Sequence, residues 1–268
     1  MKTTLTNDEL QKIISDAIIS VLEKVKIINV KGGFEIKKKT GVSRDVVLND
    51  PRYKHTRKAT EEFLTASKSE KTLRHAILPL LEHAKNNKTV NRTFSAMHKI
   101  IMADEINDKG KRNAAHGPTH KLKGFDFNYH SSLWSVLFVR FMFEFDRPSG
   151  KIKLNLPTFI PIESIVSFKS ATHFKLVSCG SEIDFLNRTS NSDIQETNYI
   201  PINYDLTGDI LLEHKVPPGS EHPLFLFLAV QFYQLVNGIQ YRLRDKTKNP
   251  VAIVAVDKIG FEIPPGFT

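Results

Sequence analysis

Residues 224–243 read LFLFLAVQFYQLVNGIQYRL, in which a long apolar run and a shorter one flank Asn237-Gly238. This dipeptide is preferred at two-residue hairpin turns, because both of its positions readily adopt a positive φ. The apolar and aromatic residues on either side favour strands. The stretch therefore predicts a β-hairpin that joins residues 224–236 to residues 239–243.

Other segments of the C-terminal half carry similar strand signals. Residues 137–145 alternate with a period of two and predict a long strand, which a turn at 147–150 connects to a partner at 152–156. About eight strands joined by turns predict an antiparallel β-sandwich, immunoglobulin-like or jelly-roll-like, with a barrel as the alternative. Shorter strands are predicted at 171–178, 182–185, 198–203, 209–215 and 251–256, with a polar loop at 187–197.

The N-terminal half has a helical period instead. Thr6-Asn-Asp-Glu9 is a capping-box pattern, and the apolar residues after it lie on one helical face as far as Val25. A short hairpin is predicted around Lys31-Gly-Gly33. Further helix starts are predicted at Asp50-Pro51, Ser67 and Thr89, with an interruption at Pro79.

These patterns predict an α+β protein with two domains. Residues 1–115 are interpreted as a basic, mostly helical domain with a short β-hairpin, and residues 116–268 as the antiparallel β-sandwich domain. Residues 107–124 are polar, basic and rich in turn formers, which is typical of a linker. The predicted boundary therefore lies within this segment.

The charge of the chain divides between the same two halves. Residues 1–123 hold 25 Lys and Arg against 14 Asp and Glu, whereas residues 124–268 hold 13 against 15. The excess positive charge of the first half would attract nucleic acid, an anionic membrane surface or an acidic protein, and we favour nucleic acid. The residues predicted to bind it are Lys37, Lys38, Lys39, Arg44, Arg52, Lys54, Arg57, Lys58, Lys109, Lys111, Arg112, Lys121 and Lys123.

The mode of binding is inferred from what surrounds these cations in the sequence. Tyr53 is the only aromatic residue closely interleaved with them, which argues against a stacking platform for single strands. Contact with the backbone of duplex or structured nucleic acid is the expected mode. The alternative is that these side chains only solvate outward helix faces, some of them paired with Glu61, Glu62 and Glu70.

Motifs for catalysis or cofactor binding are missing from the sequence. It holds no GxxxxGK[ST] loop, no GxGxxG and no HExxH. His116 and His120 have a ligand-like spacing, but Gly117 and Pro118 lie between them and no third ligand follows. Cys179 is the single cysteine. We therefore expect no cofactor and no metal, and an enzyme would require Cys179, the two histidines and acidic side chains to converge in one pocket.

Targeting signals are also missing. No stretch approaches the ~20 apolar residues that cross a bilayer, and the polar first residues do not resemble a signal peptide. These features predict a cytoplasmic protein without a membrane span.

A second functional class remains open on sequence grounds. The apolar face of residues 6–25, the predicted sandwich and the missing catalytic residues fit a structural or assembly component of a phage-like particle or a multisubunit complex. Protein partners or self-association would then be expected beside nucleic acid or another polyanion.

Several short patterns resemble an uncharacterised family of bacterial proteins that has no established function. The resemblance covers about residues 27–257, so it implies that the two parts work together, and it implies no activity, cofactor or site residue. The predicted helix at 6–25 departs from the family, which usually begins with a hairpin. The matching patterns are Asn49-Asp50-Pro51, Thr56-Arg57, Glu62-Phe63, Gly110 with Arg112-Asn113, Gly124-Phe125-x-Phe127-Asn128, and residues 171–178 with Asp184-Phe185.

Overall fold

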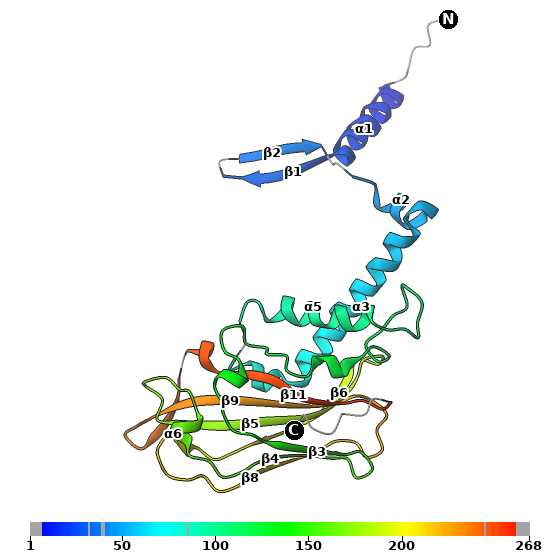
Figure 1. Cartoon of the computed structure of the whole chain (residues 1–268). Helices are drawn as coiled ribbons and strands as arrows, with labels where there is room; N and C mark the ends of the chain where they lie inside the picture. Colours follow the sequence, from blue (N-terminus) through cyan, green and yellow to red (C-terminus); the bar gives the residue numbers. More distant parts are fainter. Residues whose placement is uncertain (1–6, 32, 39–40, 85, 244, 261–268) are drawn as a thin grey trace, which may run out of the picture. The chain divides into compact units, whose positions relative to one another are not determined.

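The computed structural model describes residues 7–31, 33–38, 41–84, 86–243 and 245–260 (Figure 1). The chain divides into two compact units, Met1–Arg57 and Lys58–Thr268. The domain boundary predicted near residue 115 therefore lies inside the second unit. Helices and antiparallel sheets occur in separate stretches of the chain, which confirms the α+β class.

The first unit begins with α1 (Asn7–Lys24) and the hairpin of β1 (Val25–Val30) and β2 (Gly33–Lys38). The hairpin is antiparallel, and its register runs from Val25 opposite Lys38 to Val30 opposite Gly33. These elements confirm the predicted helix and hairpin, although Thr6 of the predicted capping box lies outside the described residues.

The first unit ends with α2 (Arg44–Asn49) and the 3-10 turn η1 (Pro51–Tyr53). The Asp50 side chain accepts a hydrogen bond from the backbone N–H of Arg52 at 2.9 Å, as expected of an N-cap before a proline. Arg57 donates from Nη1 to the carbonyls of Val47 and Asp50, at 2.7 and 2.9 Å. These contacts confirm the predicted helix start at Asp50-Pro51.

Three helices follow, namely α3 (Lys54–Ala76), α4 (Leu78–Leu81) and α5 (Thr89–Met102). The interruption predicted at Pro79 and the start at Thr89 are confirmed. The helix start predicted at Ser67 is wrong, because α3 is continuous and the Glu70 side chain pairs with Arg74 one turn onward. None of the described helices is long and apolar enough to cross a membrane.

The larger of two sheets in the second unit is built around the hairpin predicted at residues 224–243. Val236 pairs with Ile239 across Asn237 and Gly238, whose φ angles of 51° and 80° fit the predicted turn. The strand order is β10-β9-β5-β6, with β11 on β9 and β7 on β5. The strands are β5 (His173–Asp184), β6 (Thr189–Glu196), β7 (Ile200–Pro201), β9 (Leu224–Val236), β10 (Ile239–Arg242) and β11 (Val251–Asp257).

Two predictions for this sheet are wrong. The segments predicted as separate strands at 171–178 and 182–185 form the single strand β5. Gly180 lies within it because His214 packs against that position, where a Cβ atom would stand 2.5 Å from the His214 Cβ. The loop predicted at 187–197 is largely β6, whose mostly polar, partly exposed side chains hide the strand signal.

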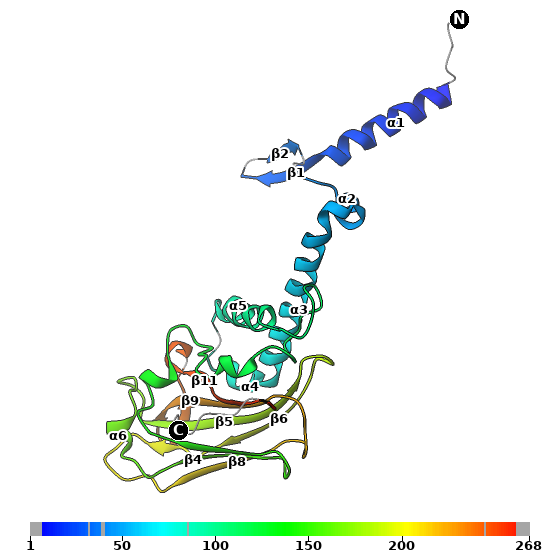
Figure 2. The same ribbon diagram turned by 45° about the vertical axis from the view of Figure 1, so that its right-hand side comes forward.

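The smaller sheet has the order β3-β4-β8 and contains β3 (Met142–Asp146), β4 (Lys151–Leu156) and β8 (Ile210–Lys215). The long strand predicted at 137–145 is mostly irregular, because Leu133–Ser135 forms a 3-10 turn and Leu137 makes only an isolated bridge to Ile165. Figure 2 shows the two sheets as neighbouring layers, with α4 and α5 on the outer side of the larger sheet.

Each face of the larger sheet buries its own hydrophobic cluster. One cluster joins Leu154 and Leu156 of β4 to Phe174, Leu226 and other side chains between the sheets. The other cluster joins α3, α4 and α5 to β5, β9 and β11 through residues that include Leu73, Ile77, Leu80, Met97, Ile101, Cys179, Phe227 and Ile253. The helices from residue 58 onward therefore share a core with the sheet.

The segment predicted as a linker at 107–124 is packed into this core. Ala114 and Leu122 are buried there. The buried Asp104 carboxylate accepts hydrogen bonds from the backbone N–H groups of Ile106, Asn107 and Asn113. Burial alone would raise the pKa of Asp104, but these hydrogen bonds and one from the Asn107 side chain hold it below its ordinary value. The polar sequence of this segment therefore forms an ordered loop.

A basic groove as candidate nucleic-acid interface

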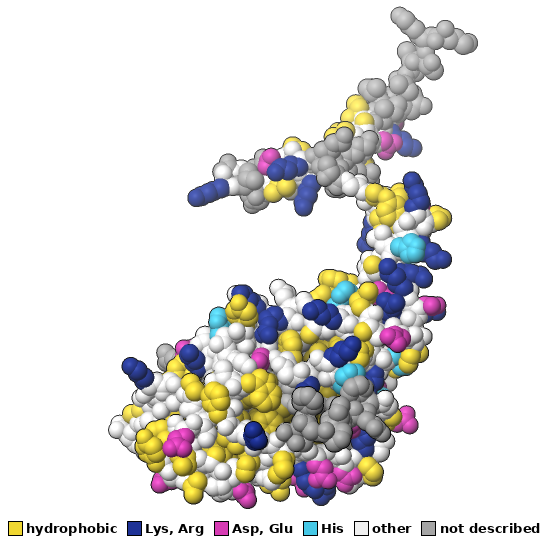
Figure 3. Space-filling view, in the orientation of Figure 1, with side chains coloured by type: hydrophobic (Ala, Val, Ile, Leu, Met, Phe, Trp, Pro, Cys, Tyr) yellow, Lys and Arg dark blue, Asp and Glu magenta, His cyan; other side chains and the backbone are white. Residues whose placement is uncertain are grey.

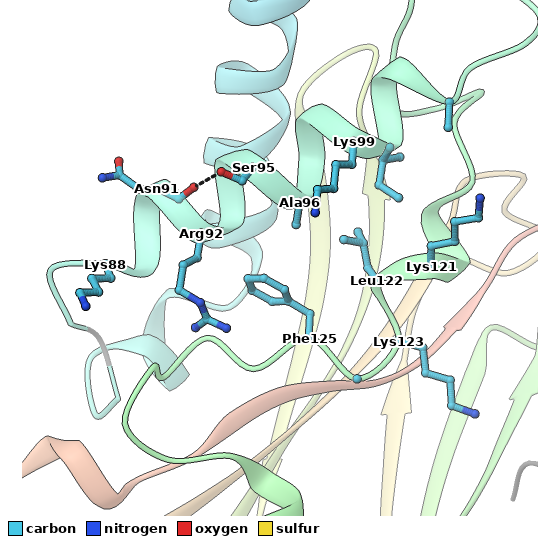
Figure 4. Close-up of a pocket in the computed structure, with 13 residues that line it drawn as sticks. Lys88, Asn91, Arg92, Ser95, Ala96, Lys99, Lys121, Leu122, Lys123 and Phe125 are labelled. Atoms are coloured by element: carbon cyan, nitrogen blue, oxygen red, sulfur yellow. Dashed lines mark hydrogen bonds between the residues drawn. The ribbon is translucent and has the colours of Figure 1, made fainter.

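A groove of about 890 Å³ runs between α5 and residues 121–125 in the second unit (Figure 4). Its lining contains five Lys or Arg residues and no Asp or Glu among the described residues. The full lining is Lys88, Asn91, Arg92, Ser95, Ala96, Lys99, Ile100, Ala103, Lys121, Leu122, Lys123, Gly124 and Phe125.

One wall of the groove is supplied by α5 and the residue before it. Met97 and Ile101 are buried in the core below the helix. Arg92 and Lys99 lie two helical turns apart on another side, and Lys88 precedes Arg92 by one turn. An amphipathic helix that buries its apolar face thus aligns these three cations along the opening.

The opposite wall begins in the 3-10 turn η2 (Thr119–Leu122) and continues as a segment held against β11. The Gly124 N–H donates to the carbonyl of Ile253 at 2.8 Å, and the Ile253 N–H donates to the carbonyl of Phe125 at 3.0 Å. Leu122 points into the core, whereas Lys121 and Lys123 are exposed. The half-buried Phe125 ring lies below Arg92, whose guanidinium carbon is 5.2 Å from the ring centroid.

A buried asparagine joins the parts that carry the groove. The Asn128 side chain is 2% exposed, and its Nδ2 donates to the carbonyls of Lys246, Thr247 and Asn249 at 2.9 to 3.0 Å. Its Oδ1 accepts hydrogen bonds from Asn86 Nδ2 and from the His130 N–H. Asn128 and these hydrogen bonds, called the Asn128 hub below, connect the loop before α5, the segment after Phe125 and the turn before β11.

Three lysines of the groove, Lys88, Lys99 and Lys121, have no ion pair with an acidic side chain among the described residues. The neighbouring His120 has its pKa lowered by burial, and then by Lys121 and Lys258. Figure 3 shows Lys and Arg side chains spaced over the helical side of this unit, with acidic ones gathered more toward the smaller sheet.

The predicted basic residues of the second unit have different environments. Lys121 and Lys123 line the groove. Lys109 and Lys111 are exposed on the loop that follows α5, and Lys58 packs against Gly110. Arg112 instead makes contacts within the protein. It pairs with the buried Glu62 at 3.9 Å and donates a hydrogen bond to the carbonyl of Met102 at 3.3 Å.

Several predicted basic residues of the first unit also have internal partners. Lys37 pairs with Glu35 at 3.2 Å, Arg52 pairs with Asp50 at 2.7 Å, and Arg57 binds backbone carbonyls. Arg44 and Lys54 are exposed, Lys38 lies on β2 without a described side chain, and Lys39 lies outside the described residues.

Sequence reasoning missed Lys88, Arg92 and Lys99. These cations are separated from one another by three and six uncharged residues, so no charge cluster marks them. Their spacing of four and seven residues would have placed them on one side of the predicted helix at Thr89. That periodicity was the available signal.

Cys179 and His116, two of the residues considered for catalysis, have the following surroundings in the described structure. Cys179 is fully buried, and burial raises the pKa of its thiol to about 12. His116 Nδ1 lies 2.9 Å from Asn107 Nδ2, and no cluster of three potential metal ligands occurs among the described residues. The Cys179 thiol is therefore not poised as a nucleophile.

Serine and histidine, two residue types that occur in catalytic sites, also meet in the buried interior as Ser178 and His214. His214 Nε2 lies 2.9 Å from Ser178 Oγ, and its Nδ1 lies 3.1 Å from the carbonyl of Asp193. The Asp193 carbonyl can only accept, so Nδ1 carries a proton, whereas the single hydroxyl proton of Ser178 has two acceptors in reach, His214 Nε2 and the Phe227 carbonyl at 3.0 Å. Both side chains are fully buried, and burial lowers the pKa of His214.

Comparisons with known proteins add no relative from which a function could be inferred. No protein-family model, no curated protein and no solved structure matches the chain. The resemblance to a bacterial family therefore stays a prediction, and the functional argument depends on the groove.

Proposed function

We propose that this protein is a non-catalytic binding protein that holds nucleic acid through its phosphate backbone along the groove between α5 and residues 121–125. The observation that carries the proposal is the lining of five cations without an acidic residue. Each cation that neutralises a phosphate releases condensed counterions, which provides a favourable free energy that depends on salt but not on sequence.

The shape of the site favours a chain-like polyanion over a flat anionic surface. The cations come from both walls of the hollow, and its apolar lining includes Ala96, Ile100 and Leu122. A flat membrane surface would meet only the rim of such a hollow, whereas a nucleic-acid strand can follow it. The paired sheets would then form a sandwich that offers protein contacts, for which Phe138, Met142 and Leu211 are exposed.

The first test is a fluorescence-anisotropy titration of the full chain with labelled DNA and RNA at low and near-physiological salt. If four to five phosphates are contacted, log K should fall against log salt with a slope of about −4. Absence of binding at low salt, or binding with a slope near zero, would remove the proposed function.

A second candidate, assembly through self-association, is favoured by α1. Ile14, Ile18, Val21 and Leu22 are each at least half exposed, and they recur at the spacing of one helical face. In the first unit, no side chain that the structure describes is buried. An apolar helix face of this kind gains free energy by packing on a second copy.

The change that tests this candidate is Ile18→Glu combined with Leu22→Glu. We expect the unaltered chain to gain mass with concentration in multi-angle light scattering, and the variant to remain a monomer, because two charges would have to be buried on association. A strict monomer at every concentration of the unaltered chain would contradict self-association. Ile36→Glu, at another exposed apolar position of the unit, is the matched control.

A further inference from the structure

An exposed tyrosine stands beside the basic groove. Tyr129 is 55% exposed, although Phe127, two residues before it, is fully buried and Phe125, four residues before it, is half-buried. Lys88 Nζ lies 4.1 Å from the centroid of the Tyr129 ring, and the Arg92 guanidinium carbon lies 5.8 Å from it. Two cations that line the groove therefore also contact this ring.

The ring is held in place by its surroundings. The His130 ring meets Tyr129 edge-on with 5.4 Å between centroids, and the His130 N–H donates to the buried Asn128 side chain at 3.0 Å. The backbone on either side of Tyr129 is thus tied to the same hub that positions α5. Little side-chain and backbone freedom remains to be lost when a ligand contacts the ring.

Exposed aromatic rings beside lysine and arginine are the usual components of sites that bind single-stranded nucleic acid. Each base offers a π face that stacks on such a ring without a requirement for sequence, while the cations contact the neighbouring phosphates. In a duplex the bases already stack on one another, and separating them costs free energy. A ring at the end of a phosphate-binding groove therefore favours single strands.

We infer that the groove prefers single-stranded nucleic acid, with a base stacked on Tyr129 and the following phosphates on Lys88, Arg92 and the cations of the opposite wall. This inference rests on the proposed function and specifies its substrate class. It departs from the expectation of duplex contact, which depended on Tyr53 as the only aromatic among the basic residues of the sequence. Tyr129 and Lys88 are far apart in the sequence, and the fold brings them together where Asn86 donates a hydrogen bond to Asn128.

The test measures Tyr129→Ala, Tyr129→Phe and the unaltered chain with three labelled probes, namely oligo-dT, a duplex of equal length and heparin, a polyanion without bases. We expect the unaltered chain to bind oligo-dT more tightly than the duplex. Tyr129→Ala should lose about tenfold in affinity for oligo-dT and less than about twofold for heparin. Tyr129→Phe should retain binding, because stacking needs the ring and not the hydroxyl.

Each contrary outcome has a distinct meaning. Failure of all three probes to bind would remove the proposed function itself. An equal loss for oligo-dT and heparin in Tyr129→Ala, or duplex binding at least as tight as oligo-dT binding, would overturn the stacking inference alone. Tyr204→Ala, at a tyrosine that is 74% exposed and does not line the groove, is the matched control and should bind oligo-dT like the unaltered chain.

Discussion

Replacing Lys99 and Lys121 together by glutamate is expected to weaken oligonucleotide binding about a hundredfold at low salt. The two side chains stand on opposite walls of the groove, and no ion pair between described residues involves either of them. Each reversal removes one phosphate contact and adds a repulsive charge, for which we assume a tenfold loss, or about 1.4 kcal/mol. The measurement is the dissociation constant from anisotropy at low salt.

The salt dependence of the same variant separates lost contacts from general repulsion. Two missing phosphate contacts should make the slope of log K against log salt shallower by about 2. An unchanged slope would mean that neither lysine contacts a phosphate. Both lysines are exposed, so the free energy of unfolding should change by no more than about 0.5 kcal/mol per site.

The matched control is Lys169→Glu with Lys215→Glu, which makes the same change in net charge outside the groove. Both residues are exposed, and neither lines the groove. If total charge alone attracted nucleic acid, the two double variants would weaken binding equally, and the groove would have no special role. We expect the control to stay within about threefold of the unaltered chain.

The parts of the fold with strong local signals could be predicted from the sequence. The β9–β10 hairpin follows from Asn237-Gly238, and the break between α3 and α4 follows from Pro79, because these residues restrict the backbone whatever surrounds them. Strand β6 could not be predicted, because its polar residues show no alternation. It forms because its backbone pairs with the buried strand β5.

The candidate site was predictable only where its residues are neighbours in the sequence. Lys121 and Lys123 belong to a visible basic cluster, whereas Lys88, Arg92 and Lys99 approach them only when α5 packs on the core. Arg112 is a predicted binding residue that the structure pairs internally. Its partner Glu62 lies in a distant helix, so the sequence presents a free cation where the structure has an internal ion pair.

One local signal for the aromatic part of the site was present in the sequence. Residues 121–130 read KLKGFDFNYH, in which two lysines and then three aromatic residues occupy alternate positions. A strand with this period would place all five on one side, but Lys121 lies in the 3-10 turn η2, Phe127 is buried and Tyr129 is exposed. Asn128, which lies between Phe127 and Tyr129, bonds to the distant carbonyls of Lys246 and Asn249, and no local pattern reveals these partners.

Removal of the Asn128 side chain should therefore affect both stability and the groove. Asn128→Ala removes the donor to the carbonyls of Lys246, Thr247 and the buried Asn249 and the acceptor for the His130 N–H and the Asn86 amide, although the Lys246 carbonyl keeps a hydrogen bond from the Asn249 N–H. Unsatisfied buried groups cost about 1–3 kcal/mol each, offset in part by water that enters the space. We expect a loss of about 3 kcal/mol in the free energy of unfolding, measured by urea denaturation.

Asn128→Asp distinguishes the hydrogen-bond donor from the volume of the side chain. The carboxylate nearly matches asparagine in shape but would place a second acceptor against three carbonyl oxygens in a buried site. We expect this variant to lose at least as much stability as Asn128→Ala. If shape alone mattered, Asn128→Asp would be nearly as stable as the unaltered protein, which would contradict the role of the amide as a donor.

The control for both variants is Asn198→Ala, at an exposed asparagine that does not line the groove, which should change the free energy of unfolding by less than about 0.5 kcal/mol. At temperatures where the Asn128 variants remain folded, their affinity for oligo-dT should fall more than that of Asn198→Ala. The reason is that Lys88 and Tyr129 flank the loop and the segment that Asn128 joins. Normal affinity in a folded Asn128→Ala protein would show that α5 and Tyr129 are positioned without the hub.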